Sequence, residues 1–191
     1  MYAILDNPQP LPASLSHEAI GPARHHRIDP RIDLSLLDLA DLNRCLTRLD
    51  PHQAPLTPDQ LATAVRELTP AGNDATTEPA CIEQRLQRAA VVEHMLEDRQ
   101  WLLAASARPT AETLVEYLHQ ARPMFTNRPQ IAHLDQAIAV ERAWPSLSRE
   151  VRQYLQFCQR EDRATAAASA KRPWVSPGSY LPASIDCFRV H

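Results

Sequence analysis

Apolar residues in this chain recur with the spacing of an α-helix, in stretches that end at proline. The first stretch places Leu39, Leu42, Leu46 and Leu49 three or four positions apart, and Pro51 follows it. Such spacing puts the side chains on one face of a helix. No segment alternates apolar and polar residues over more than about five positions, as a half-buried strand would. The sequence therefore predicts an all-α fold, an irregular bundle of about six helices.

Capping residues and prolines set the expected helix boundaries. Ser35 and Thr57 are the expected N-caps of the first two helices, each with a suitable residue three positions later. The longest stretch, about 79–106, would span roughly 40 Å as one straight helix, which exceeds the width of a small domain. We therefore expect either a break near the polar run 97–100 or a projecting end. Further helices are expected over about 110–122, about 128–144, and from Ser146 or Ser148 to Pro173.

The helical pattern occupies residues 31–170, and a segment of a different character lies on each side of it. Residues 1–30 hold five prolines and few periodic apolar positions, which predicts a flexible or loosely docked N-terminal arm. Residues 171–191 form a C-terminal tail that contains prolines and carries a net charge of +2. The tail also holds three of the ten aromatic residues of the chain, Trp174, Tyr180 and Phe188. Because flexible tails are usually poor in aromatic residues, we expect this one to dock against a partner or against its own bundle.

Glycine content excludes several classes of enzyme. The chain has only 3 glycines and a single lysine, Lys171, so it holds neither a P-loop nor a dinucleotide-binding fingerprint. It also lacks the G-x-S-x-G turn of many hydrolases. We therefore expect no nucleotide cofactor, and the balance favours a protein that is not an enzyme.

One pair of residues offers an alternative, a helical metalloenzyme. Glu116 and His119 stand three positions apart on an expected helix, so that carboxylate and imidazole share a face, as in di-iron bundles. Such sites need a second E-x-x-H motif, which the sequence does not contain. No metal ligand is therefore assigned, and the pair is interpreted as part of an exposed face. His133 and Asp135 stand in no motif that would single them out.

The four cysteines form no C-x-x-C pair, which argues against a clustered metal or redox site. Cys45 and Cys158 fall on or beside apolar helix faces, which predicts buried thiols. Cys81 stands near a helix N-terminus, where the helix dipole favours the thiolate, but a structural or incidental thiol is the preferred interpretation. Free thiols of this kind are typical of a reducing cytoplasm.

Charge and hydropathy limit the partners. The net charge is −3, which disfavours nucleic acid and acidic lipid for the chain as a whole. A nucleic-acid-binding module that uses the last helix and the tail stays open as an alternative.

No apolar run is long enough to span a bilayer, and no secretory signal is present, so a cytoplasmic location is expected. The abundance of Ala, Leu, Arg and Pro is typical of a GC-rich bacterial genome, and export by a specialised secretion system is a further alternative.

These patterns together favour a protein that binds another protein, as an adaptor, regulator or chaperone-like factor. The expected partner-binding residues lie in the tail, where aromatic side chains would anchor the contact and arginines would surround it. They are Trp174, Tyr180, Phe188, Arg172 and Arg189.

Overall fold

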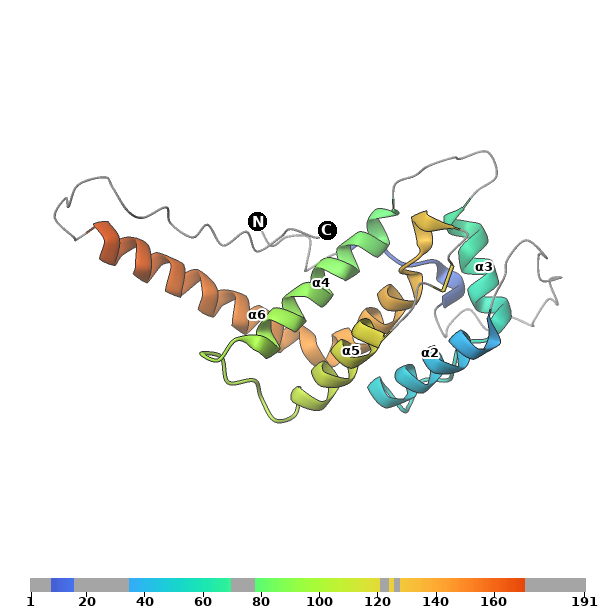
Figure 1. Ribbon diagram of the computed structural model, residues 1–191, viewed down its shortest axis with the longest axis horizontal. Helices are drawn as coiled ribbons and strands as arrows, with labels where there is room; N and C mark the ends of the chain where they lie inside the picture. Colours follow the sequence, from blue (N-terminus) through green and yellow to red (C-terminus); the bar gives the residue numbers. More distant parts are fainter. Residues whose placement is uncertain (1–7, 16–34, 70–77, 121–123, 126–127, 171–191) are drawn as a thin grey trace. The chain divides into compact units, whose positions relative to one another are not determined.

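The computed structural model of the chain describes residues 8–15, 35–69, 78–120, 124–125 and 128–170. These residues form five α-helices, α2 to α6, and two short 3-10 helices, η1 and η3, with no strand among them (Figure 1). The predicted all-α class is therefore confirmed. The chain divides into two units, Met1–Tyr154 and Leu155–His191, and the described part of the second unit is the remainder of α6.

The first two α-helices begin where their caps place them. Helix α2, Leu36–Leu49, has Ser35 as its N-cap, and the Ser35 hydroxyl accepts a hydrogen bond from the Asp38 backbone N–H at 3.3 Å. Helix α3, Pro58–Leu68, starts with a complete capping box between Thr57 and Gln60. Because a cap satisfies N–H groups that have no partner inside the helix, both starting points can be predicted from sequence.

The loop between these helices is fastened by one side chain of α2. The Asn43 amide donates a hydrogen bond to the Leu56 carbonyl at 2.9 Å and accepts one from the Leu56 N–H at 2.8 Å. The Leu56 side chain is itself buried. The paired bonds thus satisfy both backbone groups of Leu56 and fix where the chain turns towards α3.

Helix α4, Ala80–Glu97, ends at the polar run where the sequence predicts a break. Asp98 is its C-cap, and its carboxylate accepts hydrogen bonds from the Gln100 N–H at 2.8 Å and the Tyr154 hydroxyl at 3.1 Å. The chain then returns as α5, Arg108–Gln120, which contacts both α4 and α2. Of the two alternatives, a break or a projecting end, the break is therefore confirmed, and Asp98 holds the turn that follows α4.

The last two expected helices are in fact one, and this prediction was wrong. A short 3-10 helix, η3, occupies Pro129–Ile131, and α6 then runs from Leu134 to Ala170 with Pro145 inside it. Proline within a helix loses one hydrogen bond and costs about 3 kcal/mol. On either side of Pro145, however, Ala143 and Leu147 are completely buried. Burial of the same helix face before and after the proline offsets that cost, so the helix continues.

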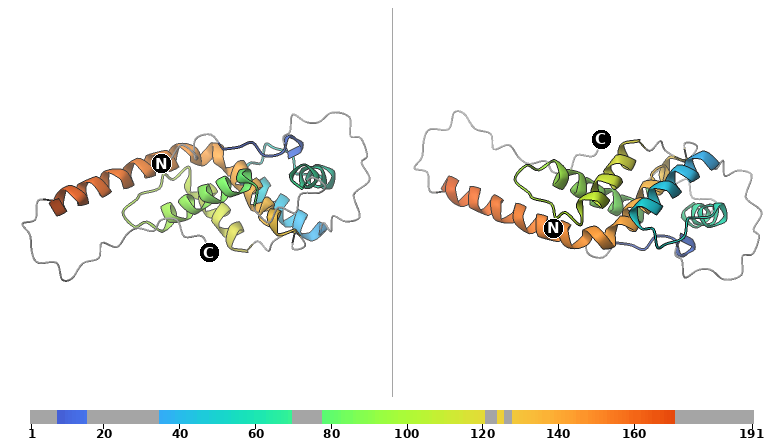
Figure 2. Two further views of the ribbon diagram at one scale, coloured as in Figure 1. Left: turned by 90° about the horizontal axis from the view of Figure 1, so that it is seen from above. Right: turned by 90° about the horizontal axis from the view of Figure 1, so that it is seen from below.

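Part of the expected N-terminal arm is docked. Residues 8–15 include η1, Ala13–Leu15, which contacts α3 and lies beside it in Figure 2. The Gln9 N–H donates to the Gln84 side chain at 2.7 Å, and the Gln9 carbonyl accepts from Arg85 at 2.7 Å. The rest of the arm, 1–7 and 16–30, lies outside the described residues.

Two arginines of α4 are buried in the core, each only 2% exposed. Arg85 donates to the Glu141 carboxylate at 2.9 Å and to the Cys81 carbonyl at 2.8 Å, besides its bond to residue 9. Arg88 lies 3.9 Å from the Glu141 carboxylate and places its guanidinium 3.9 Å from the centre of the Trp144 ring. These contacts join the N-terminal segment, α4 and α6, and the apolar spacing of the sequence did not predict them.

The rest of the core is mostly apolar and draws on all five α-helices and on η3. Its completely buried members include Leu42, Leu46, Leu61, Val65, Ile82, Val92, Leu114, Ile131 and Leu134. None of the helices that the structure describes combines the length and the hydrophobicity needed to cross a bilayer.

Replacing Asn43 by Ala should lower the free energy of unfolding by about 2–3 kcal/mol, because both backbone groups of Leu56 would lose their partners. Asn43→Asp should cost less, since a carboxylate still accepts from the Leu56 N–H. Urea unfolding followed by circular dichroism measures both values. The exposed loop residue Gln53, changed to Ala, serves as the control and should change stability by less than about 0.5 kcal/mol. An Asn43→Ala variant as stable as the wild type would show that the loop is not held by this side chain.

Candidate functional site

The partner-binding residues predicted from the sequence all lie outside the described residues. Trp174, Tyr180, Phe188, Arg172 and Arg189 belong to segment 171–191, for which the structure gives no placement. The tail therefore stays a prediction, and the described residues offer a different site.

The E-x-x-H pair is present on α5, but its two side chains have different partners. The Glu116 carboxylate accepts from Arg48 of α2 at 3.0 Å, whereas the His119 ring contacts the Glu93 carboxylate of α4. Across the described ranges, no group of three or more His, Cys, Asp or Glu side chains is placed to hold a metal ion. Glu116 thus belongs to a contact between α5 and α2, and His119 to one between α5 and α4.

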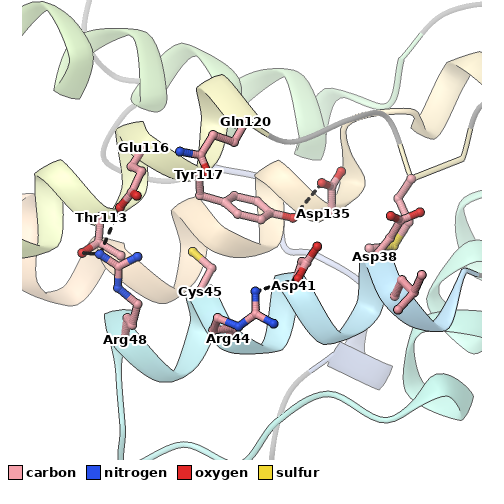
Figure 3. A pocket seen from close by; sticks show the side chains of 12 residues that line it. Asp38, Asp41, Arg44, Cys45, Arg48, Thr113, Glu116, Tyr117, Gln120 and Asp135 are labelled. Atoms are coloured by element: carbon pink, nitrogen blue, oxygen red, sulfur yellow. Dashed lines mark hydrogen bonds and ion pairs between the residues drawn. The ribbon is translucent and has the colours of Figure 1, made fainter.

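The Glu116 contact lies at the edge of a pocket of about 440 Å³ between α2 and α5 (Figure 3). One wall is the face of α2 that carries Asp38, Asp41, Cys45 and Arg48. These positions are three or four residues apart, so their side chains share one face of α2, and that face lines the cavity. The opposite wall comes from α5, and the start of α6 contributes one further residue, Asp135.

Asp135 is the most unusual residue of the pocket, because its carboxyl group is charged in water yet only 1% exposed here. Its Oδ2 accepts a hydrogen bond from the Tyr117 hydroxyl at 2.9 Å, which Figure 3 shows reaching across from α5. Its Oδ1 is buried and has no hydrogen-bond partner among the described residues. Burial raises the pKa of Asp135 to about 6, although the bond from Tyr117 and the nearby backbone N–H groups of Asp135 and Gln136 act in the opposite direction.

Two other titratable groups of the pocket are held in their neutral forms. Burial raises the pKa of the Cys45 thiol to about 12. Burial, together with the neighbouring Asp135 carboxylate, also raises the pKa of Tyr117 well above its usual value. Both groups therefore stay protonated at neutral pH, and neither is an activated nucleophile.

Of the other described cysteines, only Cys158 departs from the expectation drawn from sequence. Cys81 is buried at the start of α4, and burial raises the pKa of its thiol, so desolvation outweighs the helix dipole. Cys158 is partly exposed, whereas its apolar helix face predicted a buried thiol. The buried thiol predicted for Cys45 is confirmed.

Charged groups surround the mouth of the pocket. Arg44 pairs with Asp41 at 2.7 Å, and Arg48 pairs with Glu116. The lining holds four carboxylates and two guanidiniums, which leaves a formal charge of −2 when all are ionised. Next to this mouth, at the start of α2, Leu36 and Leu37 are 70% and 79% exposed. The pocket is thus acidic inside and apolar at one edge.

Sequence motifs did not reveal Asp135, but its spacing could have done so. Ile131, Leu134 and Ile138 form the apolar stripe at the start of this helical stretch. Asp135 stands four positions after Ile131 and three before Ile138, which is the helical spacing of that stripe. A carboxylate on an otherwise apolar helix face is either paired or has a perturbed pKa, so this spacing is the sequence signal that marks Asp135.

The raised pKa of Asp135 makes stability depend on pH. Between about pH 4 and pH 6 the Asp135 carboxyl group is protonated in the folded chain but ionised in the unfolded chain. The contribution of Asp135 to the free energy of unfolding therefore falls as the pH rises through this window, by up to roughly 3 kcal/mol. Asp135→Asn removes the titration, so the stability of the variant relative to the wild type should increase from pH 4 to pH 7. Urea unfolding at several pH values tests this, with the exposed Glu67, changed to Gln, as the control. A difference that stays constant across the window would show that Asp135 does not hold this proton.

Comparison with known proteins identifies no relative of this chain. No protein-family model, no curated protein and no solved structure gives a significant match to the chain. A function for the chain must therefore be inferred from the side chains of the pocket itself, because a helical fold alone is compatible with many functions.

Proposed function

We propose that the chain is a non-enzymatic protein-binding protein, and that the pocket between α2 and α5 receives a cationic side chain of its partner, a lysine or an arginine. The observation that carries this proposal is the buried Asp135 carboxyl group, whose Oδ1 has no hydrogen-bond partner among the described residues. It lines a cavity whose formal charge is −2.

An ammonium or guanidinium group would supply the positive charge and the hydrogen-bond donors that the Asp135 carboxylate lacks. A buried carboxylate is costly unless it is paired and hydrogen-bonded, and one bond from Tyr117 satisfies only part of its capacity. A cation with several N–H donors would pair with the Asp135 charge, with a small adjustment of the pocket to let it reach Oδ1. The Asp38 carboxylate at the mouth would attract the same charge before it enters, whereas Asp41 is already paired with Arg44.

The edge of the pocket favours a protein partner over a free small cation. Leu36 and Leu37 are large apolar side chains that are mostly exposed, and Leu37 also lines the pocket. Adjacent exposed apolar residues beside a polar pocket are typical of protein-binding surfaces. A lysine or arginine in the pocket would bring the neighbouring part of its own chain onto these two leucines.

The chemistry of the pocket supports binding over catalysis. Cys45 and Tyr117 are two potential nucleophiles of the lining, and burial raises the pKa of each, so both remain protonated at neutral pH. The proposal includes a bacterial and cytoplasmic origin, with which the free thiols of Cys45, Cys81 and Cys158 are compatible. The aromatic tail is a second expected contact with the same partner, and the nucleic-acid alternative stays a prediction.

Titration calorimetry with small probes tests the pocket directly. Nα-acetyl-lysine amide should bind the full chain at neutral pH, and its neutral analogue Nα-acetyl-norleucine amide should not. Asp135→Asn keeps the acceptor for Tyr117 but removes the charge, so it should weaken binding of the lysine probe at least about tenfold. Lowering the pH from 7 to 5 should weaken it by a similar factor, because the proton on Asp135 then competes with the cation.

The control for this experiment is Glu67→Gln, which removes one exposed carboxylate of α3 and should leave binding of the lysine probe unchanged. Equal affinity of the wild type and Asp135→Asn for the probe would exclude Asp135 as its receptor. Equal affinity for the lysine and norleucine probes would show that the pocket does not select charge.

Protein capture separates the contribution of the pocket from that of the tail. The wild type, the control Glu67→Gln, Asp135→Asn and the double variant Trp174→Ala/Phe188→Ala would each be used as bait in a bacterial lysate, followed by mass spectrometry. A protein retained by the wild type and Glu67→Gln but lost by Asp135→Asn would be a pocket-dependent partner.

Loss of that protein from the tail variant, with an unchanged thermal midpoint, would assign part of the contact to the tail. A large fall in the midpoint of the tail variant would instead show that these aromatic residues complete the core.

A further inference from the structure

A second cavity, of about 730 Å³, lies on a different part of the first unit. The docked N-terminal segment forms one wall through Pro10, Leu11 and Pro12, and α6 forms another through Glu141 and Arg142. It shares no lining residue with the pocket between α2 and α5. Ligand binding to this second cavity can therefore be tested independently of the proposed function.

Arg142 lines this cavity and is 8% exposed. Its Nη1 is buried without a hydrogen-bond partner, and within the described part of the chain its guanidinium takes part in no ion pair. Burial lowers the pKa of Arg142, and the charge of Asp50 partly offsets this effect. A cationic group that is buried but not paired is costly unless something supplies an acceptor.

Arg85 lines the same cavity, and its guanidinium, unlike that of Arg142, already has several hydrogen-bond partners. Its Nε donates to the Glu141 carboxylate, and its Nη1 donates to the Cys81 and Gln9 carbonyls, so protein groups already accept three hydrogen bonds from it. The contrast identifies Arg142 as the member of the pair that has capacity for an external acceptor.

The charge and the walls of the cavity define the kind of acceptor. Arg85 and Arg142 contribute two positive charges and Glu141 one negative charge, so the lining carries a formal +1 when His52 is neutral. One excess charge suits a monoanion, because a second negative charge on the ligand would face the Glu141 carboxylate. The prolines of the N-terminal segment, with Ile138 and Pro145 of α6, provide apolar surface around it.

We propose that Arg142 anchors a second binding site, which takes a small organic monocarboxylate with an apolar body. The carboxylate bonds to the Arg142 guanidinium, and the apolar body contacts Pro10, Pro12 and Ile138. Planar guanidinium and carboxylate groups match each other in two parallel hydrogen bonds, which makes arginine well suited to this ligand class.

Calorimetry and ligand-observed NMR with the full chain test this site, with benzoate and butanoate as the carboxylate probes and benzamide as the neutral analogue. Benzoate should bind saturably at millimolar concentration, and benzamide should not. Arg142→Gln should weaken benzoate binding at least about tenfold, the loss expected when a charge-assisted hydrogen bond is removed. Inorganic phosphate should bind more weakly than benzoate, because it carries a second charge and no apolar body.

Three matched variants make the result interpretable. Arg149→Gln removes an exposed arginine of the same helix and should bind benzoate like the wild type. Arg142→Lys keeps the charge and should bind with intermediate affinity. Asp135→Asn alters only the other pocket and should leave benzoate binding unchanged, which separates this site from the proposed function.

Circular dichroism confirms that each variant is folded before its affinity is measured. Absence of saturable binding of both benzoate and butanoate to the wild type would overturn the proposal, and so would equal affinity of the wild type and a folded Arg142→Gln for benzoate.

Discussion

The ion pair between Arg85 and Glu141 links three segments of the first unit that are far apart in the sequence. The Arg85 guanidinium is almost completely buried, and it joins the carbonyl of Gln9, its own helix α4 and the Glu141 carboxylate of α6. Arg88 lies one turn further along α4, with its guanidinium over the Trp144 ring of α6. Because Glu141 is about half exposed, the pair is not fully removed from water, which lessens the desolvation cost of a buried ion pair.

Helix α6, which this ion pair joins to α4, contributes a residue to each candidate site. Asp135 precedes Glu141 by fewer than two turns, and Arg142 follows it directly. The same helix therefore brings one buried carboxyl group to the α2–α5 pocket and one buried guanidinium to the second cavity. Each of these groups lowers stability where it stands without a complete set of partners, and residues of this kind are retained most often where they serve a site.

The local elements of this fold could be predicted from sequence, and the long-range contacts could not. Caps at Ser35 and Thr57 and the polar run after Glu97 act within a few residues, so the sequence predicts where α2, α3 and α4 begin or end. The passage of α6 through Pro145 depends on burial of the residues around it by other helices, which no local pattern contains. The spacing of Asp135 places it on an apolar helix face, but its bond to Tyr117 and its degree of burial arise from packing between α5 and α6 and could not be predicted locally.

The raised pKa of Asp135 couples the pocket to protons as well as to ligands. A carboxyl group that titrates near pH 6 holds a fraction of a proton in the unbound protein at neutral or mildly acid pH. A cation that pairs with this group would displace that fraction into the buffer, and by linkage the proton would displace the cation with the same coupling free energy. The heat measured for such an exchange would include the ionisation enthalpy of the buffer, so the pocket would behave as a cation–proton exchanger on a protein surface.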